Sequence, residues 1–251
     1  MPVAVYKPVS KTPLECVLAY RIIHTIPPEV PVSYAGRLDP MAEGVLLLLV
    51  GDENKQRRSF EHLNKSYEVT CVFGISTDSG DGMGIPLLSS KLEINSARLN
   101  SCLNKYVGTY DQRYHPYSSR IIEGKPLFYW AKQGLLHTIK IPTHRVSVSD
   151  IKLIFESKIR LKDLIADIVH RVSEVSGDFR QQEIIKAWSQ LDQHEKQLPM
   201  FTLRVECETG GTYIRVLIED IAHDLELQAC TYRLTRTQVG EWKLDNCLRL
   251  W

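Results

Sequence analysis

One aspartate stands in a polar loop that runs directly into an apolar segment. The loop, residues 33–44, reads SYAGRLDPMAEG and carries Asp39, and residues 45–51 read VLLLLVG. The proline after Asp39 biases the backbone toward an extended conformation and turns the carboxylate outward. Gly36 and Gly44 permit a tight turn that is open to a ligand. A carboxylate placed in this way is suited to nucleophilic or proton-transfer chemistry, with an ordinary Asp-Pro surface turn as the alternative.

Cysteine and histidine residues do not show the spacing of a metal site. The six cysteines are spread along the chain without a close pair, and His115 and His144 lack partners at zinc-ligand separations. Disulfide scaffolds are short and dense in cysteine, so a disulfide framework is excluded as well. We expect reduced thiols, several of them buried as small apolar groups, and no metal.

Composition indicates an ordinary globular protein. The chain has 251 residues, of which 43% are hydrophobic and 24% charged, enough for one large or two small domains. Its apolar runs fall short of the roughly 20 residues needed to span a bilayer, and its first residues lack a signal-peptide pattern. We therefore expect a soluble protein that is cytoplasmic, with an organellar location through a signal outside these patterns as the alternative. The net charge of +1 does not indicate a nucleic-acid partner, although clustered cations would still attract phosphate.

Local patterns predict the elements that position these residues. Thr12, Pro13 and Glu15 form the pattern of a capping box, so a helix should begin there and end near Thr25. Residues 45–50 fit a strand that is buried on both faces. Residues 77–84, which are rich in glycine and aspartate, predict a polar loop. Further helices are predicted at 54–64, 96–106, 124–134 and 216–225, and further strands at 65–74, 138–141, 145–155, 201–207 and 231–239.

Residues 157–197 show a helical pattern of apolar residues that differs from the strand patterns on either side. Apolar residues recur at helical spacing from Leu161 to Val175, Gly177 interrupts the pattern, and Ile184 to Leu191 resume it. This pattern predicts a helical hairpin inserted between two strands. Its mixed charges favour packing on the domain or on a partner over membrane contact. With no internal repeat, one mixed α/β body is the economical interpretation.

Taken together, the motifs resemble those of the TruB-type tRNA pseudouridine synthases. They follow the family's order over most of the chain, and the ordered set is specific although each motif alone is weak. The resemblance implies an α+β pseudouridine-synthase fold, in which helices flank a mixed, mostly antiparallel sheet with an RNA cleft across its middle. It further implies a single catalytic domain, residues 1–251, with residues 157–197 inserted. The motifs are Lys7-Pro8, Gly36-x-Leu38-Asp39-Pro40-x-Ala42-x-Gly44, Lys65-x-Tyr67, Thr77-Asp78-Ser79-Gly80-Asp81, Tyr117-Ser118 with Gly124-Lys125-Pro126-Leu127, Gly211-Thr212-Tyr213-Ile214-Arg215 and Leu234-x-Arg236.

The resemblance assigns catalytic roles to Asp39, Tyr67 and Arg215. Asp39 would attack the sugar or the base, or take a proton from the ribose, and the two alternatives stay open. Arg215 would pair with this carboxylate and keep it ionised. Tyr67 would stack on the extruded uracil and handle a proton, and Leu234 would supply an apolar wall. Because the reaction is an isomerisation, it needs no cofactor.

Further residues are expected to bind the RNA. Tyr34 stands where the family usually has a histidine, and it retains a ring that would stack on a base. Tyr213 belongs to the motif that carries the catalytic arginine. Lys7, Lys65, Arg113, Arg233 and Arg236 are candidates for phosphate contacts, of which we expect about half to be merely solvated charges.

The chain also departs from the family pattern. Arg37-Leu38-Asp39 with Glu43-Gly44 is similar to the RsuA-type ribosomal RNA synthases, which share the catalytic fold. Ile121 replaces a lysine often found after the Tyr-Ser pair. The chain is expected to lack the small C-terminal RNA-binding domain, PUA, of many relatives, and the 157–197 hairpin is not part of the usual pattern.

These features predict an enzyme that converts the T-loop uridine, position 55, of tRNA. The expected partner is the T-arm of tRNA, and we expect a monomer without an obligatory protein partner. One alternative is the same reaction on ribosomal or another RNA. The other is an RNA-binding folding chaperone in which the chemistry is incidental.

Overall fold

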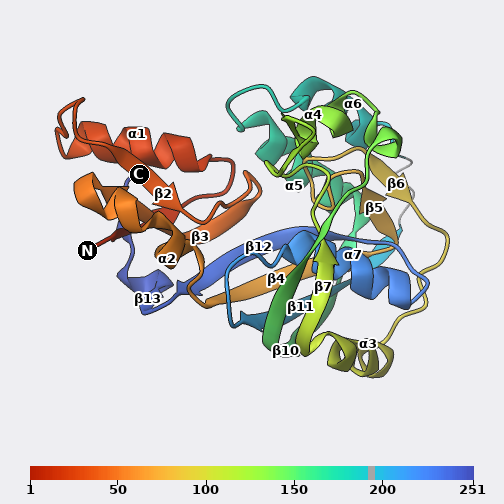
Figure 1. The fold of residues 1–251 in the computed structure, drawn as a ribbon. Helices are drawn as coiled ribbons and strands as arrows, with labels where there is room; N and C mark the ends of the chain where they lie inside the picture. Colours follow the sequence, from red (N-terminus) through yellow and green to blue (C-terminus); the bar gives the residue numbers. More distant parts are fainter. Residues whose placement is uncertain (192–195) are drawn as a thin grey trace.

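The computed structural model describes residues 1–191 and 196–251. A large sheet contains β1 (Val3–Lys7), β2 (Val32–Ala35), β3 (Ala42–Val50), β4 (Lys65–Phe73), β7 (Gly108–Arg113), β10 (Thr143–Arg160), β11 (Gln197–Cys207), β12 (Ala229–Val239), β13 (Trp242–Lys243) and β14 (Leu248–Arg249). Its strand order is β14-β1-β3-β12-β4-β11-β10-β7, with β2 paired to β3 and β13 to β12. Figure 1 labels the part of this order from β3 to β7. The β1–β14 and β3–β12 pairs are parallel, and the other pairs described in this sheet are antiparallel. The predicted α+β fold with a mixed, mostly antiparallel sheet is confirmed.

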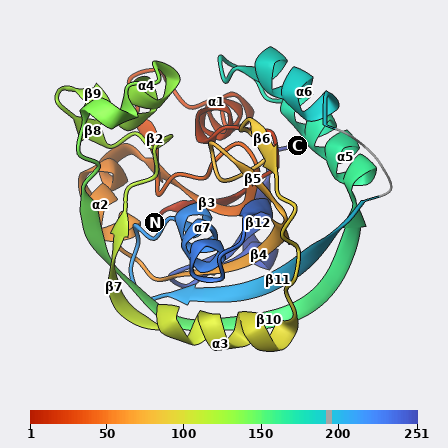
Figure 2. The same cartoon turned by 90° about the vertical axis from the view of Figure 1, so that its right-hand side faces the viewer.

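The helices gather around this sheet. They are α1 (Pro13–Ile23), α2 (Arg57–Glu61), α3 (Ser96–Leu103), α4 (Leu127–Lys132), α5 (Leu161–Ser173), α6 (Gln181–Ser189) and α7 (Ile214–Asp224). Two small hairpins are formed by β5 (Ile75–Thr77) with β6 (Pro86–Leu88) and by β8 (Ile121–Ile122) with β9 (Lys125–Pro126). The sheet curves around α7 (Figure 2), so the element that carries Arg215 lies against the centre of the sheet.

Strand β3 is buried on both faces, as its unbroken apolar sequence predicts. Leu46 and Leu48 pack into a cluster with α1, whereas Leu47 and Leu49 pack on the opposite side with Val239. All four leucines are fully buried. Burial of a leucine side chain contributes about 2 kcal/mol, so the strand that follows Asp39 is firmly anchored.

Several predicted helix boundaries are confirmed. Helix α1 begins at Pro13, with Thr12 and Glu15 forming the capping box, and ends at Ile23. Strand β4 and helix α3 begin at the predicted residues, and β10, β11 and β12 extend the predicted strands by a few residues at one or both ends. The 77–84 segment is the turn between β5 and β6.

Two predictions are wrong. Residues 54–64 do not form one helix, because a 3₁₀ turn, Gly51–Gln56, precedes the short α2. Residues 138–141 do not form a strand; a 3₁₀ turn, Leu136–Thr138, lies there instead. The pairing of β10 with β7 begins only at Thr143, opposite Arg113, so the preceding residues have no neighbouring strand to bond.

The predicted helical hairpin is present between β10 and β11. Its helical part is shorter than residues 157–197, because β10 continues to Arg160 and β11 begins at Gln197. Helix α5 ends at Ser173, and Gly177, which has a φ of 100°, lies in the connection to α6. Residues 192–195 of the predicted hairpin lie outside the described residues. That the segment is an insertion relative to the usual pattern of the TruB-type synthases stays a prediction.

The state of the cysteines agrees with the sequence. Each of the six is a free thiol, and all except Cys247 are buried. Burial raises the pKa of the Cys16 thiol to about 11, so this thiol is protonated at neutral pH. None of the helices in residues 1–191 and 196–251 has the length and apolarity needed to cross a membrane.

Candidate active site

Asp39 and Arg215 form an ion pair between the loop before β3 and the first turn of α7. Arg215 Nε donates to Asp39 Oδ2 at 2.8 Å, and the side chains are 6% and 38% exposed, respectively. A guanidinium this well buried needs compensating charge. Burial acts to lower the pKa of Arg215, but the nearby carboxylates of Asp39, Asp81 and Glu219 raise it above its usual value overall. The juxtaposition predicted from the sequence is confirmed.

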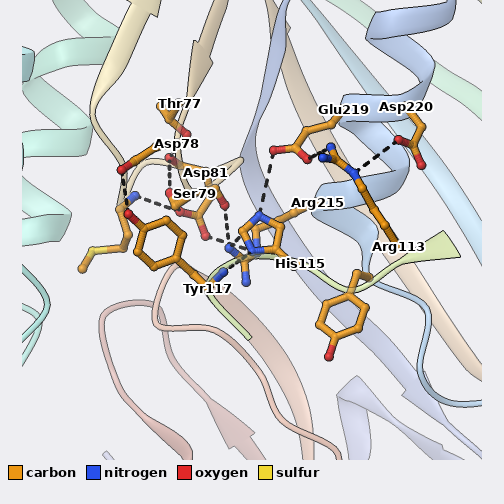
Figure 3. A network of polar contacts seen from close by, with 12 residues as sticks. Thr77, Asp78, Ser79, Asp81, Arg113, His115, Tyr117, Arg215, Glu219 and Asp220 are labelled. Carbon is orange, nitrogen blue, oxygen red and sulfur yellow. Dashed lines mark hydrogen bonds and ion pairs between the residues drawn. The ribbon is translucent and has the colours of Figure 1, made fainter. Parts of the chain in front are cut away.

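A second acidic segment holds the other side of Arg215. Nη1 of Arg215 donates to the carbonyl oxygen of Ser79 at 2.5 Å, and Nε lies 3.7 Å from Asp81 Oδ2. Asp81 accepts hydrogen bonds from the Ser79 hydroxyl and the Met83 backbone N–H, at 2.8 and 2.9 Å. Burial raises the pKa of Asp81, although Arg215 opposes this shift. Figure 3 shows these residues converging on the guanidinium from the β5–β6 turn.

His115 completes the enclosure of Arg215. Its imidazole is fully buried, and Nε2 lies 3.5 Å from Arg215 Nη1 and 3.9 Å from Glu219 Oε1 (Figure 3). The backbone N–H of Tyr117 donates to Nδ1 at 3.0 Å, so Nε2 carries the proton of the neutral ring. Burial, Arg215 and Arg113 together lower the pKa of His115 well below its ordinary value. The ring is therefore neutral at physiological pH.

Sequence reasoning missed part of this enclosure. His115 lacks metal-ligand spacing in the sequence, and nothing else in its local sequence distinguishes it. The segment 77–81 was part of the motif set but was otherwise interpreted as a polar turn. Glu219 gave no signal of its own, although it follows Arg215 by one helical turn and thus shares its face of α7.

A pocket opens beside the ion pair. Its empty volume is about 200 Å³, which includes open solvent, and Leu234 forms part of its wall, as predicted. The wall combines the Asp39 loop, the β5–β6 turn, α7 and β12. The lining residues are Asp39, Met41, Ala42, Asp81, Arg215, Thr231, Tyr232 and Leu234.

Tyr67 lies behind this wall. It is 6% exposed and belongs to the core cluster that also contains Leu38, Ala42 and Leu234. Burial raises the pKa of Tyr67 to about 12, against the opposing effect of the Arg236 guanidinium. The phenol is therefore protonated at neutral pH and available as a donor. Its stacking on a base stays a prediction, because the ring is covered in this conformation.

The side chains of Lys7 and Arg236 donate hydrogen bonds to the backbone of the Asp39 loop and the start of β3. Lys7 Nζ donates to the carbonyl oxygens of Pro40 and Ala42, at 3.4 and 2.6 Å. Arg236 donates to Val45, Arg37 and Gly36, and the three donor–acceptor distances are 2.8, 3.1 and 3.2 Å. These contacts supply donors to carbonyl groups of the loop and of β3, and the Pro40 carbonyl oxygen also accepts from the Ser10 backbone N–H at 2.8 Å.

The expected phosphate contacts of three buried cations are not supported. Lys7, Lys65 and Arg236 are 0%, 4% and 1% exposed, so a phosphate cannot reach their charged groups in this conformation. Lys65 Nζ donates to the carbonyl oxygens of Glu61 and Leu63, at 2.9 and 2.7 Å. Instead of binding phosphate, these three side chains donate hydrogen bonds to backbone carbonyl oxygens inside the protein.

The remaining substrate-binding candidates, Tyr213 and Tyr34, are not among the residues that line the pocket. Tyr213 precedes α7, and its backbone N–H and C=O pair with the side chain of Gln112 at 2.8 and 3.1 Å. Its half-buried ring contacts Tyr114 and His144 edge-on. Tyr34 lies on β2, with the Arg57 guanidinium 5.7 Å from its ring centroid, and does not line the pocket.

The two exposed phosphate candidates differ in their partners. Arg233 follows the pocket residue Tyr232, its side chain is 56% exposed, and it lies 3.6 Å from Asp167. Arg113 is 47% exposed but is engaged by Glu219 at 2.7 Å. Arg233 is thus the better placed of the two to meet a phosphate at the pocket. Within the part of the chain that the structure describes, no group of three or more histidine, cysteine, aspartate or glutamate residues is arranged to hold a metal ion.

Comparison with known proteins gives consistent matches. A family model described as "TruB family pseudouridylate synthase (N terminal domain)" matches residues 28–179. The tRNA pseudouridine synthase B of Ralstonia nicotianae is 30% identical over 87% of this chain and 57% of its own length. The tRNA pseudouridine synthase 4 of Saccharomyces cerevisiae is 26% identical over 86% of this chain and 62% of its own length. The chain thus spans less than two thirds of the length of these relatives.

Solved structures share the fold. The archaeal box H/ACA sRNP Nop10–Cbf5 complex superposes with a TM-score of 0.58 at 16% identity, covering 99% of this chain and 51% of the other. A Cbf5–Nop10–Gar1 complex gives a TM-score of 0.59 at 17% identity, covering 99% and 52%. At this level of identity the likeness extends to the fold alone.

Proposed function

This chain belongs to the TruB family of pseudouridylate synthases, and we propose that it isomerises uridine to pseudouridine in tRNA, at position 55 of the T loop. The observation that carries the proposal is the Asp39–Arg215 pair at the edge of a pocket, with a half-exposed carboxylate and a buried guanidinium. The names of the relatives support tRNA as the substrate class. The T-loop position rests on the ordered motifs of the sequence.

The chemistry requires a base outside its stack. The reaction breaks the N1–C1′ bond, turns the uracil and joins C5 to C1′; the C5 proton leaves and N1 gains a proton, so nothing is oxidised or reduced. Extruding the base costs about a few kcal/mol. The folded T loop, rather than a base sequence, would supply recognition.

We assign the roles as follows. Asp39 attacks the sugar or the base, or removes a ribose proton, because its carboxylate is the exposed partner of the pair. Arg215 orients that carboxylate through a charge-assisted hydrogen bond. Leu234 shields the detached base from water, and the protonated phenol of Tyr67 stacks on the base and donates to it once the base has entered.

The proposal also covers RNA contacts: Tyr34 and Tyr213 would contact the RNA, and Arg233 would meet a phosphate.

We further propose that the protein has a single catalytic domain, is a monomer without an obligatory partner, and is located in the cytoplasm. The Cbf5 structures are complexes with other proteins, so light scattering of the purified chain is the direct test of the monomer.

The test is turnover of an unmodified tRNA transcript labelled with tritium at C5 of uridine. The wild type should release the tritium and form pseudouridine at position 55, whereas Asp39→Asn should abolish release with an unchanged melting temperature. Asp52→Asn, which alters a 91% exposed carboxylate, is the matched control and should turn over normally. Full turnover by the Asp39 variant would refute the mechanism. Pseudouridine at a different site or in a different RNA would refute the assigned substrate.

A further inference from the structure

Helices α5 and α6 contact the segments that form the active-site pocket. Ile168 of α5 and Trp188 of α6 belong to the same core cluster as Met41 and Tyr232, which line the pocket. Both Ile168 and Trp188 are almost completely buried. The helix pair is therefore packed against the site rather than attached to the outside of the domain.

Helix α6 holds the β5–β6 turn at two points. Arg180, which precedes α6, donates from Nη2 to Asp78 Oδ2 at 2.9 Å. The Tyr117 hydroxyl donates to the same oxygen at 2.7 Å (Figure 3), and the Arg180 guanidinium lies 4.9 Å from the Tyr117 ring centroid. Further along, buried Trp188 donates from Nε1 to the carbonyl oxygen of Gly84 at 3.0 Å. Both ends of the turn are thus tied to α6.

Helix α5 holds the pocket residue Tyr232 in the same way. The Tyr232 hydroxyl donates to Asp167 Oδ2 at 2.7 Å, and Arg171 Nη1 donates to the Tyr232 carbonyl oxygen at 3.0 Å. Asp167 also pairs with Arg171. Two guanidinium groups lie near the Tyr232 ring, those of Arg171 at 4.7 Å and Arg233 at 4.9 Å from its centroid.

These contacts reach Asp39 through two further contacts, from the β5–β6 turn to Arg215 and from Arg215 to Asp39. The β5–β6 turn supplies Ser79 and Asp81, which hold Arg215, and Arg215 holds Asp39. We propose that the α5–α6 pair is a positioning element, which keeps Arg215 and Tyr232 in register with Asp39 through the contacts of Arg180 and Asp167. The inference rests on the proposed function, because it concerns the same site. A displacement of about 1 Å in an active site can cost about 100-fold in rate.

The experiment compares contacts that face the site with similar contacts that do not. Arg180→Gln and Asp167→Asn remove the charges that strengthen the inward contacts. Arg160→Gln and Asp163→Asn are the controls, since Arg160 and Asp163 form a surface ion pair at 2.5 Å at the start of α5. Single-turnover rate, RNA dissociation constant and melting temperature are measured for each, together with hydrogen–deuterium exchange of residues 77–84.

We expect Arg180→Gln and Asp167→Asn to lower the single-turnover rate about 10- to 100-fold, with the RNA dissociation constant changed less than about twofold. Arg180→Gln should also raise exchange in residues 77–84, and Arg180→Lys should restore most of the rate. Both controls should match the wild type. If the inward variants keep the wild-type rate, or lose rate only in proportion to RNA binding or melting temperature, the inference is overturned. An inactive wild type would instead overturn the proposed function, and the inference with it.

Discussion

Gly44 of β3 and Arg236 of β12 lie so close across their parallel pairing that no side chain fits between them. A Cβ atom on Gly44 would lie 2.8 Å from the backbone nitrogen of Arg236 and nearer still to its carbonyl oxygen. The Arg236 side chain then reaches back to the carbonyl oxygens of Gly36 and Arg37 at the other end of the loop. One residue of β12 therefore fixes both ends of the loop that carries Asp39.

Gly44→Ala should destabilise the protein by about 3 kcal/mol and lower turnover, because the added methyl group forces β3 away from β12. Gly44 also has a φ of 114°, a conformation that side chains rarely adopt. Gly51→Ala is the control, since Gly51 has a positive φ of 63° but open space around its Cβ position. Urea unfolding measures the free energy of unfolding of the two variants. Equal losses in the two variants would show that the conformation, not the close approach, sets the cost.

Arg215→Met should destabilise the fold as well as abolish turnover, because it leaves the buried carboxylate of Asp81 without its cation. Removing one partner of a buried pair costs about 3–5 kcal/mol. Adding Asp81→Asn should recover most of that stability but no activity, since Asp39 still lacks its partner. A double-mutant cycle in urea, with turnover assayed in parallel, measures the coupling. Additive losses would mean that Asp81 does not depend on Arg215.

The free energy of unfolding should rise with pH because of Lys7. Burial lowers the pKa of Lys7 to about 8 in the folded state, whereas the ordinary value is 10.5. Between these values the unfolded chain binds a proton that the folded chain has lost, so stability rises as pH increases. This lysine alone should add about 2 kcal/mol between pH 7 and 9.5.

Urea unfolding of the wild type and of Lys7→Met at these two pH values isolates that contribution. The variant has no titrating group at this position, so the difference in stability between the two proteins should change by this amount. A difference that does not depend on pH would show that Lys7 titrates normally.

The salt dependence of RNA binding should distinguish exposed from buried cations. Arg233→Gln should reduce the slope of log affinity against log salt concentration by about one unit, as expected for one lost phosphate contact. Lys65→Met should leave the slope unchanged, because its ammonium group is enclosed and bonded to backbone carbonyls. Binding isotherms at several salt concentrations provide the comparison. A reduced slope for Lys65→Met would mean that the loop opens to RNA.

Patterns within short stretches of sequence determined much of the fold and the central pair. The capping box of Thr12 and Glu15 starts α1, and the apolar run of residues 45–50 becomes a strand buried on both faces. Asp39 and Arg215 were identified because their motifs resemble those of the TruB family. Signals of this kind involve residues that are close together in the sequence, so they can be recognised without the tertiary structure.

Tertiary structure alone decided which charges are buried and what surrounds Arg215. Lysine and arginine usually lie at the protein surface. Lys7, Lys65 and Arg236 are nevertheless buried, because strands from distant parts of the chain enclose them. His115 and the α5–α6 pair reach the site in the same way, through contacts between segments far apart in sequence. The physical reason is that burial and pairing depend on which segments become neighbours in space, and no local pattern records that choice.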